Sequence, residues 1–162
     1  MAEKSKRPMD WEALVLRNEN HMYRAALALL GNREEARDAV QDALLKYLEK
    51  RPSFENEQHE RAWLLRVTVN GCKSRLRAPW RRRRVDLSAA LEVAAEAPVA
   101  EELEELGSLP PKDRAAIHLY YYEGYSTAEI ARMEGEAEGT VRARLHRARQ
   151  KLRRLLDEEE NP

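Results

Sequence analysis

The sequence predicts an all-α protein made of two small helical domains that an acidic linker joins. Apolar residues recur at spacings of three and four along most of the chain, which is the period of an amphipathic helix, and no run shows the alternation of a strand. The chain has 162 residues, of which 43% are hydrophobic, enough for small cores. Charged residues make up 36% and fall into blocks, so we expect separate units.

Two helices are expected at the start of the chain. Asp10 is a suitable N-cap for the first, because its carboxylate can accept from first-turn amides, and Gly31 can adopt the left-handed conformation of a helix end. Asn32 is expected to cap the second helix, with Glu35 placed as its capping-box partner, and Pro52 to stop it. The apolar stripe of this second helix repeats over four turns, which is a strong helical signal.

A third helix is expected over residues 61–77, after a polar loop over residues 54–60. Its apolar positions keep the spacing of three and four, and a proline follows its end. We assign residues 8–84 to this first, three-helix domain. Because it is short, its core has to come from the stripes of all three helices.

The charges of the chain lie in blocks, although the net charge is zero. Residues 61–84 carry nine basic and no acidic side chains, and residues 140–156 carry seven basic and no acidic ones. Between them, residues 85–106 carry seven acidic and no basic ones, and we interpret them as an extended linker. Two cationic blocks around an acidic spacer favour a polyanion bound at two places. Solvated helix faces whose charges balance are the alternative.

The second domain, residues 107–158, has the pattern of a helix-turn-helix. A helix that opens on two prolines comes first. Ser126 and Glu129 then form a capping box for a short helix, and Gly135 supplies the turn. A basic amphipathic helix follows over residues 140–152, suited to the major groove of duplex DNA.

Composition excludes several classes of site. A single cysteine, Cys72, allows no intramolecular disulfide and is typical of a reducing compartment. The four histidines lie far apart without metal-ligand spacing, and no nucleophile–base pair or phosphate-binding glycine loop is present, so we expect neither an enzyme nor a cofactor or metal site. No apolar run approaches the roughly 18 residues of a membrane helix, and no signal peptide opens the chain. We therefore expect a soluble cytoplasmic protein.

Both halves of the chain resemble one known family. Residues 109–114, 120–131 and 139–153 resemble region 4 of the extracytoplasmic-function (ECF) sigma factors. Residues 30–46 resemble the polymerase-binding helix of region 2 in that family, and residues 62–73 resemble its −10 recognition helix. The two matches occur in the family's order, with an acidic linker between them. The resemblance implies an alternative sigma factor with regions 2 and 4 only, which binds core RNA polymerase and directs promoter-specific initiation of transcription.

The resemblance implies a polymerase-binding surface on the second helix, which in the family docks on the clamp coiled coil of the largest polymerase subunit. The matching residues are Asp38, Gln41, Asp42 and Leu45. Leu45 lies outside the apolar stripe of its helix, beside carboxylates, and an exposed leucine in that position suits a partner better than water. A solvated polar face is the alternative.

The resemblance also implies −10 recognition by the third helix. The matching residues, spaced three or four apart on one face, are Arg66, Asn70, Lys73 and Arg77. Asparagine can bond to base edges, and the cations can contact phosphates. The loop at residues 54–60 resembles one that captures a base flipped from the non-template strand. Trp63 matches an aromatic position of the family, but we expect it in the core.

In the second domain, the residues matching the −35-facing stretch of the family are Thr140, Arg142, Arg144, His146 and Arg147. Instead of contacting DNA, Arg144 could be a solvated side chain. His146 could be a residue that only fills space. Contacts of this kind would recognise the −35 duplex and make holoenzyme binding depend on salt.

The chain departs from the family in the turn of the helix-turn-helix. Glu134 and Glu136 occupy positions that are usually apolar in the family, and Ala137 stands where a capping residue is common. A lost cap costs about 1 kcal/mol, and a carboxylate forced into a small core costs more or swings outward. We therefore predict a marginal or unusually solvated second domain.

The expected partners are core RNA polymerase, promoter DNA and, as is common in the family, an anti-sigma factor. Two other classes are possible. A stand-alone helix-turn-helix regulator would bind duplex DNA without polymerase, and a helical adaptor would bind nucleic acid without promoter preference. A nuclease would need clustered carboxylates near a basic groove, and residues 61–84 contain none.

Overall fold

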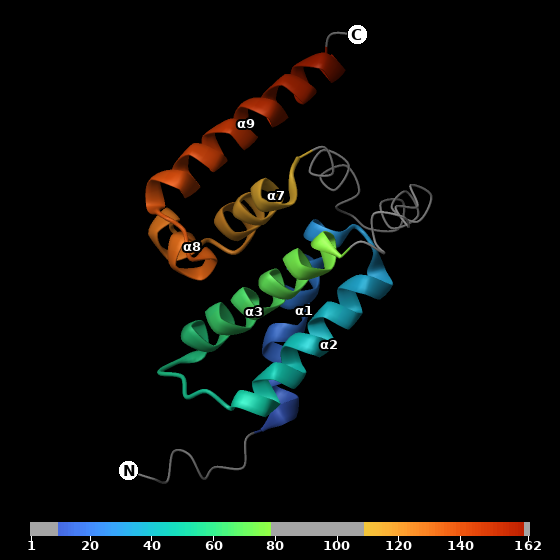
Figure 1. Ribbon diagram of the computed structural model, residues 1–162, viewed down its shortest axis with the longest axis vertical. Helices are drawn as coiled ribbons and strands as arrows, with labels where there is room; N and C mark the ends of the chain where they lie inside the picture. The colour runs from blue at the N-terminus through green and yellow to red at the C-terminus, as the bar shows by residue number, and fades with distance from the viewer. Residues whose placement is uncertain (1–9, 79–108, 161–162) are drawn as a thin grey trace.

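The structure is a computed structural model that describes residues 10–78 and 109–160, with side chains as far as residue 154. The elements described there are all helices: α1 (Trp11–Leu30), α2 (Arg33–Lys50), α3 (Glu57–Arg77), α7 (Pro111–Ile117), the π-helix η2 (His118–Tyr122), α8 (Thr127–Glu134) and α9 (Glu138–Glu160). Figure 1 shows α1, α2 and α3 as one group, with α7, α8 and α9 beside them as a second group. The predicted all-α class with two helical units is confirmed, while the predicted linker lies outside the described residues.

The caps of α1 and α2 form at the predicted residues. The Asp10 side chain accepts from the backbone N–H of Ala13 at 3.1 Å, and the Asn32 side chain accepts from that of Glu35 at 2.9 Å. Gly31 ends α1 with φ 64°, a left-handed conformation that glycine adopts without a Cβ penalty. Because each cap joins residues at most four apart, short stretches of sequence are sufficient to predict it.

The third helix begins earlier than predicted. Asn56 caps it, because its side chain accepts from the backbone N–H of His59 at 2.8 Å, and α3 therefore starts at Glu57. The loop predicted over residues 54–60 is wrong for residues 57–60. Phe54 packs against the core and stacks on Tyr47, with ring centroids 5.9 Å apart.

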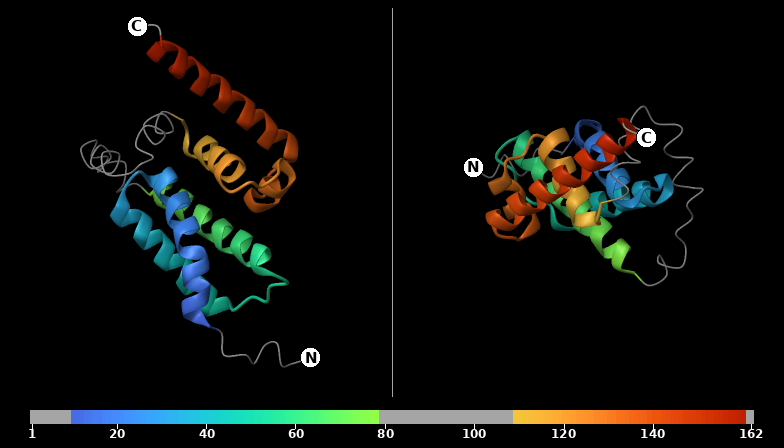
Figure 2. Two further views of the ribbon diagram at one scale, coloured as in Figure 1. Left: turned by 180° about the vertical axis from the view of Figure 1, so that it is seen from behind. Right: turned by 90° about the horizontal axis from the view of Figure 1, so that it is seen from above.

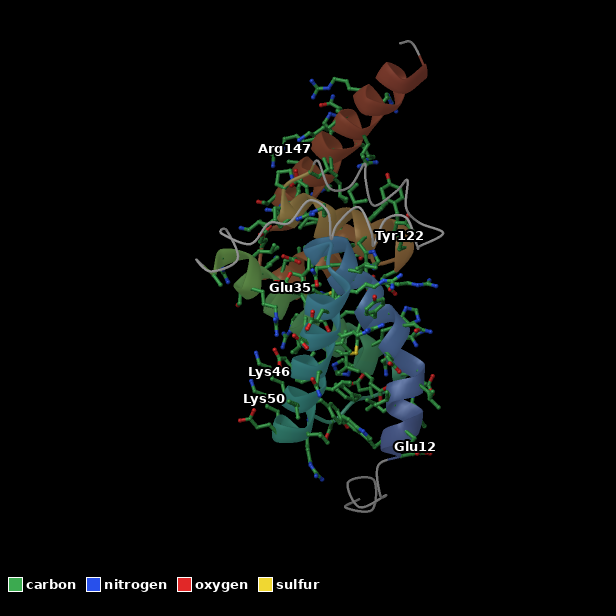
Figure 3. The ribbon with its side chains drawn as sticks, turned by 90° about the vertical axis from the view of Figure 1, so that its right-hand side faces the viewer. Glu12, Glu35, Lys46, Lys50, Tyr122 and Arg147 are labelled. Atoms are coloured by element: carbon green, nitrogen blue, oxygen red, sulfur yellow. The ribbon has the colours of Figure 1, made fainter. Side chains whose placement is uncertain are left out.

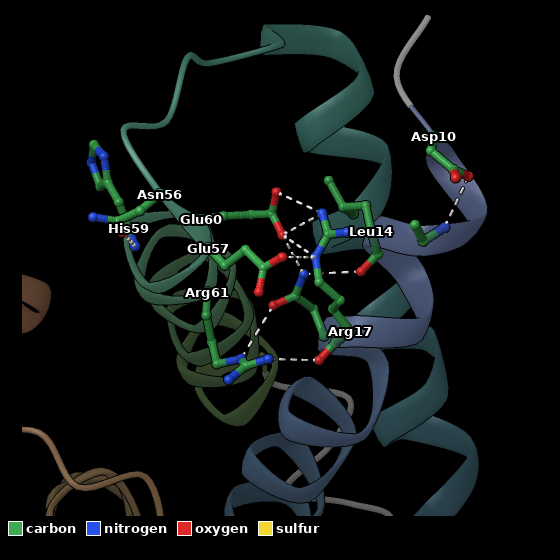
Figure 4. A network of polar contacts seen from close by, with 10 residues as sticks. Asp10, Leu14, Arg17, Asn56, Glu57, His59, Glu60 and Arg61 are labelled. Atoms are coloured by element: carbon green, nitrogen blue, oxygen red, sulfur yellow. Dashed lines mark hydrogen bonds and ion pairs between the residues drawn. The ribbon is translucent and has the colours of Figure 1, made fainter.

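A buried polar network holds the start of α3 against α1 (Figure 4). The Asn18 side chain, which is fully buried, donates to the Glu60 carboxylate at 2.8 Å. Arg17 donates to the same carboxylate, and Arg61 donates to the Asn18 side-chain oxygen and to the Arg17 carbonyl. Buried polar groups are tolerated when their partners are present, so this network fixes the place of α3.

The first core lies between α1, α2 and α3, and its large buried side chains include Leu14, Met22, Leu29, Tyr47 and Leu64. Trp63 packs against this core and meets Tyr47 edge-on, with ring centroids 6.0 Å apart. The tryptophan therefore belongs to the core, as predicted. Cys72 is fully buried in the same cluster.

The second core lies between α7, η2, α8 and α9, around Leu119, Ile130, Val141 and Leu145. The predicted capping box of α8 is present, with Ser126 and Glu129 bonded in both directions. Gly135 ends α8 with φ 66° and allows the turn into α9. These elements form the helix-turn-helix that the sequence predicts.

The two helical groups contact each other. α7 packs on α1, α8 packs on α3, and Ala115 of α7 joins the core of the first group. His21 of α1 also meets Glu123, at the end of η2, with Nδ1 and Oε2 2.8 Å apart. Figure 2 shows the second group lying along the first from behind and from above. None of the helices described here combines the length and apolar character needed to cross a bilayer.

Candidate functional site

The four residues predicted to bind polymerase share one exposed face of α2. Asp38, Gln41, Asp42 and Leu45 follow helical spacing, and all four are exposed. Leu45 has 56% of its surface accessible although it is apolar. Arg75 of α3 donates to the Asp42 carboxylate at 2.7 Å, a contact that the sequence alone does not reveal because it depends on how α3 packs beside α2. This side of α2 is thus apolar at Leu45 and Leu48, acidic at Asp38 and Asp42, and joined to α3 by the ion pair between Asp42 and Arg75.

The predicted −10 face of α3 is exposed at three of its four positions. Arg66, Asn70 and Arg77 face solvent. The Lys73 side chain has only 15% of its surface accessible, because the carboxylate of Glu134, at the end of α8, lies against its ammonium group. The structure therefore brings the four residues onto one helix face, and the second helical group covers part of that face.

Burial lowers the pKa of Lys73 to about 8. The positive charges of Lys112, Arg144 and Arg77 act in the same direction, while the negative charge of Glu136 opposes them. Lys73 and Arg144 are therefore largely withdrawn from water between α3 and the turn after α8, with the carboxylates of Glu134 and Glu136 beside them. A lysine in such surroundings keeps its charge less easily than one in water.

An open groove of about 410 Å³ lies along the contact between α3 and α8. Its walls contain residues of both helical groups: Gln58, His59, Ala62, Trp63, Arg66, Tyr125, Glu129, Arg132 and Met133. Burial raises the pKa of Tyr125 to about 12, so this phenol stays protonated and can donate a hydrogen bond. Arg66 of the −10 face thus opens onto a groove that α8 helps to build.

Four of the five residues predicted to face −35 DNA are exposed on α9. They are Thr140, Arg142, His146 and Arg147. Figure 3 shows Arg147 on the outside of this helix. Val141, Leu145 and Ala148 are buried in the second core, so α9 presents its polar side to solvent. The arrangement suits a helix that enters a groove of duplex DNA.

Arg144 does not share this exposed face. Its side chain is 9% accessible, donates to the Glu136 carboxylate and lies 3.5 Å from Asp113. The alternative of a solvated side chain is wrong for the same reason. Helical spacing contains a signal for this placement, because Arg144 follows Val141 by three residues and precedes Ala148 by four, and both are buried.

The turn carboxylates, from which a marginal or unusually solvated second domain is predicted, do not swing outward into solvent. Glu134 is 2% accessible at its side chain and contacts Lys73, while Glu136 accepts from Arg144 and lies 3.8 Å from Lys112. The carboxylates lie neither in the apolar core nor in water, because cations from both helical groups pair with them. Lys73 belongs to the other helical group and lies far from Glu134 in the sequence, so the local pattern could not identify this partner.

Family models match both halves of the chain. The model for sigma-70 region 2 matches residues 14–82, and the model for sigma-70 region 4 matches residues 101–152. The first match covers the α2 and α3 faces described above, and the second covers the helix-turn-helix.

Curated relatives match over most of the chain. The ECF RNA polymerase sigma factor SigM of Mycobacterium tuberculosis is 37% identical over 90% of this chain and 76% of its own. SigL of the same species, also an ECF RNA polymerase sigma factor, is 35% identical over 85% of this chain and 83% of its own.

Solved structures agree with these relatives. The sigma factor RpoE of Bartonella quintana, in complex with the anti-sigma factor NepR, has a TM-score of 0.72 at 27% identity, covering 91% of this chain and 97% of that one. CnrH, in complex with the cytosolic domain of CnrY, has a TM-score of 0.69 at 28% identity, covering 94% and 91%. With two helical groups, an exposed basic helix-turn-helix and matches to both sigma regions, this chain belongs to the ECF sigma factors, alternative sigma factors that direct RNA polymerase to specific promoters.

Proposed function

We propose that three surfaces of the chain divide the work of promoter-specific initiation in the cytoplasm. The α2 face binds core RNA polymerase, the α3 face binds the −10 non-template strand, and the exposed side of α9 recognises the −35 duplex. Residues 8–84 and 107–158 form the two functional domains, with residues 85–106 as the acidic linker between them. The chain acts by binding and supplies no catalytic group of its own.

The observation that carries the docking part is the exposed Leu45 within an acidic rim. Leu45 is more than half accessible, and Leu48, one turn later on α2, is 36% accessible, so the two leucines offer an apolar patch that a partner can bury. Gln41 lies one turn before Leu45 and Asp38 two turns before it, on the same face. A basic or mixed surface on the polymerase would bury the leucine and pair with the carboxylates around it.

The DNA part is supported by the chemistry and spacing of the exposed residues. Asn70 can bond to a base edge, while Arg66 and Arg77 on either side of it can contact phosphates. On α9, Arg142 and Arg147 offer the same phosphate contacts beside His146 and Thr140, which can bond to groove atoms. We propose that the α3 residues stabilise the open complex at the −10 strand and that the α9 residues bind the −35 duplex.

An anti-sigma factor is proposed as a further partner. RpoE was solved with the anti-sigma factor NepR, and CnrH with the cytosolic domain of CnrY. Both structures resemble this chain over more than nine-tenths of its length, which supports a partner of the same kind here.

The docking proposal is tested by the affinity of the labelled chain for core RNA polymerase, measured by fluorescence anisotropy. We expect Asp38→Arg to weaken binding at least about tenfold, which corresponds to about 1.4 kcal/mol, because it reverses a charge on the rim of the docking face. Asp38 is preferred to Asp42 for this test, since changing Asp42 also breaks its ion pair with Arg75.

Glu19→Arg is the matched control, because Glu19 is also exposed but lies on α1. Its affinity for polymerase should equal that of the wild type. Equal binding by the wild type and both variants would refute docking through α2. A wild-type chain that ignores active core enzyme yet binds duplex DNA tightly would favour a stand-alone regulator.

A further inference from the structure

The two unusual carboxylates of the helix-turn-helix lie between the two DNA-binding helices. Glu134 ends α8, and Glu136 lies in the turn before α9. Glu134 contacts Lys73 on the −10 face of α3, and Glu136 accepts from Arg144 on α9. One short segment of the chain therefore pairs with a cation from each of the two helices that we propose to bind DNA.

These contacts take place out of water. The side chains of Glu134, Lys73 and Arg144 are respectively 2%, 15% and 9% accessible. Burial lowers the pKa of Lys73, as expected for an ammonium group that has lost most of its hydration. An ion pair in such a place is strongly destabilised when one partner is removed, because the other charge remains buried without compensation.

The cations need the carboxylates in order to stay together. Lys73, Lys112 and Arg144 come from α3, α7 and α9, and like charges at this spacing repel each other. Glu136 lies 3.8 Å from Lys112 and bonds to Arg144, so it screens two of them. Without the two carboxylates, the contact between α3 and the second helical group would bring Lys73 toward Lys112 and Arg144 with no negative charge between them.

We propose that Glu134 forms an acidic latch, which keeps the free chain closed by occupying Lys73 of α3 as a phosphate would, while Glu136 holds Arg144 and Lys112 in place within the second helical group. The latch rests on the function proposed above, because Lys73 lies in its −10 face. A closed chain cannot present the whole of this face to DNA, so opening must come before full promoter binding. Docking on polymerase, which uses α2 on another part of the first helical group, remains possible in the closed form.

The latch is tested in the full-length free chain by the distance between spin labels at Glu12→Cys and Gln150→Cys. Both positions are exposed, and Figure 3 shows Glu12 at the far end of α1 from α9. Cys72 is fully buried, so the two exposed cysteines react first. We expect one narrow distance population in the otherwise wild-type chain at pH 7, which represents the closed form.

The variant Glu134→Gln/Glu136→Gln should shift the ratio of open to closed chains at least about tenfold, within the usual range of couplings between sites. The matched control is Glu19→Gln/Glu138→Gln, which removes two exposed carboxylates and should leave the distance unchanged. Circular dichroism checks that each variant keeps its helix content.

A charge exchange tests the latch from the opposite side and guards against damage to the helix-turn-helix. Lys73→Glu should open the chain, and Lys73→Glu/Glu134→Lys should close it again. A wild-type chain that is already open would overturn the latch, as would a closed distance that survives both Glu134→Gln/Glu136→Gln and Lys73→Glu. Promoter opening by the wild-type holoenzyme, measured in a separate arm, reports on the proposed −10 function alone, so a failure of that function is distinguished from a failure of the latch.

Discussion

Replacing Asn18 tests how the DNA-binding helix α3 is held in place. Asn18 is fully buried in α1, donates to the Glu60 carboxylate and accepts from Arg61. Asn18→Ala removes these two bonds to α3, while the bonds that Arg17 makes to Glu60 and Arg61 remain. The bond to a carboxylate contributes about 2 kcal/mol and the longer bond from Arg61 about 1 kcal/mol, so we expect a loss of about 3 kcal/mol.

A loss of this size is large for the first helical group. A domain of 60–100 residues has a total stability on the order of 5 kcal/mol and loses roughly 4–8 °C in Tm for each kcal/mol, so the expected decrease in Tm is about 12–24 °C. Urea unfolding followed by circular dichroism gives the change in the free energy of unfolding directly.

Asn70→Ala is the matched control, because Asn70 is an exposed asparagine within a helix of the same group. Both substitutions gain about 0.5 kcal/mol of helix propensity, so the difference between the two variants isolates the buried network. Asn70→Ala should keep its stability and lose promoter opening, whereas Asn18→Ala should lose stability. A difference below about 1 kcal/mol would refute the reasoning that the network positions α3.

Two further predictions concern DNA and pH. Arg147→Ala should weaken holoenzyme binding to promoter duplex about tenfold and lower the dependence of log affinity on log salt by about one unit, as measured by filter binding, while Arg24→Ala on α1 leaves both unchanged. Burial alone would raise the pKa values of Glu123 and Glu136, but the histidines beside Glu123 and the Arg144 beside Glu136 outweigh it and hold both below the ordinary 4.5. Because the folded-state values are lowered, their stabilisation is complete above about pH 4.5 and is lost as the pH falls further. Urea unfolding between pH 7 and pH 3 should show this decrease, and Glu123→Gln/Glu136→Gln should flatten it; an equally steep decrease in that variant would contradict the assignment.

Helix ends could be predicted from the sequence because their chemistry is local. The caps at Asp10, Asn32 and Ser126 each bond to a residue three positions later, and Gly31 and Gly135 end helices through their own backbone freedom. The start of α3 was missed because Asn56 lies within a polar stretch that looks like a loop. Its cap is local, but Glu60 is held by Asn18 and Arg17 of α1, so the stability of that first turn depends on tertiary contacts.

The polymerase and DNA faces divide in the same way. Helical spacing predicts that the four polymerase-binding residues share one side of α2 and that the four −10 residues share one side of α3. The structure shows both arrangements. The spacing of residues along one helix does not show which of them a second helix covers. Lys73 and Arg144 were therefore predicted as DNA contacts, although in this structure both are largely buried against carboxylates.

The sequence by itself determined the helices, their order, the charge blocks and the family resemblance, since all of these depend on neighbouring residues or on motif order. Only the tertiary structure decided the environment of Glu134 and Glu136. From the local sequence, each carboxylate is expected either in a small apolar core or in water. The local sequence does not show that a cation from α3 lies beside Glu134. The packing of α8 on α3 supplied that cation, and it made an apparent defect of the helix-turn-helix into a contact between the two DNA-binding helices.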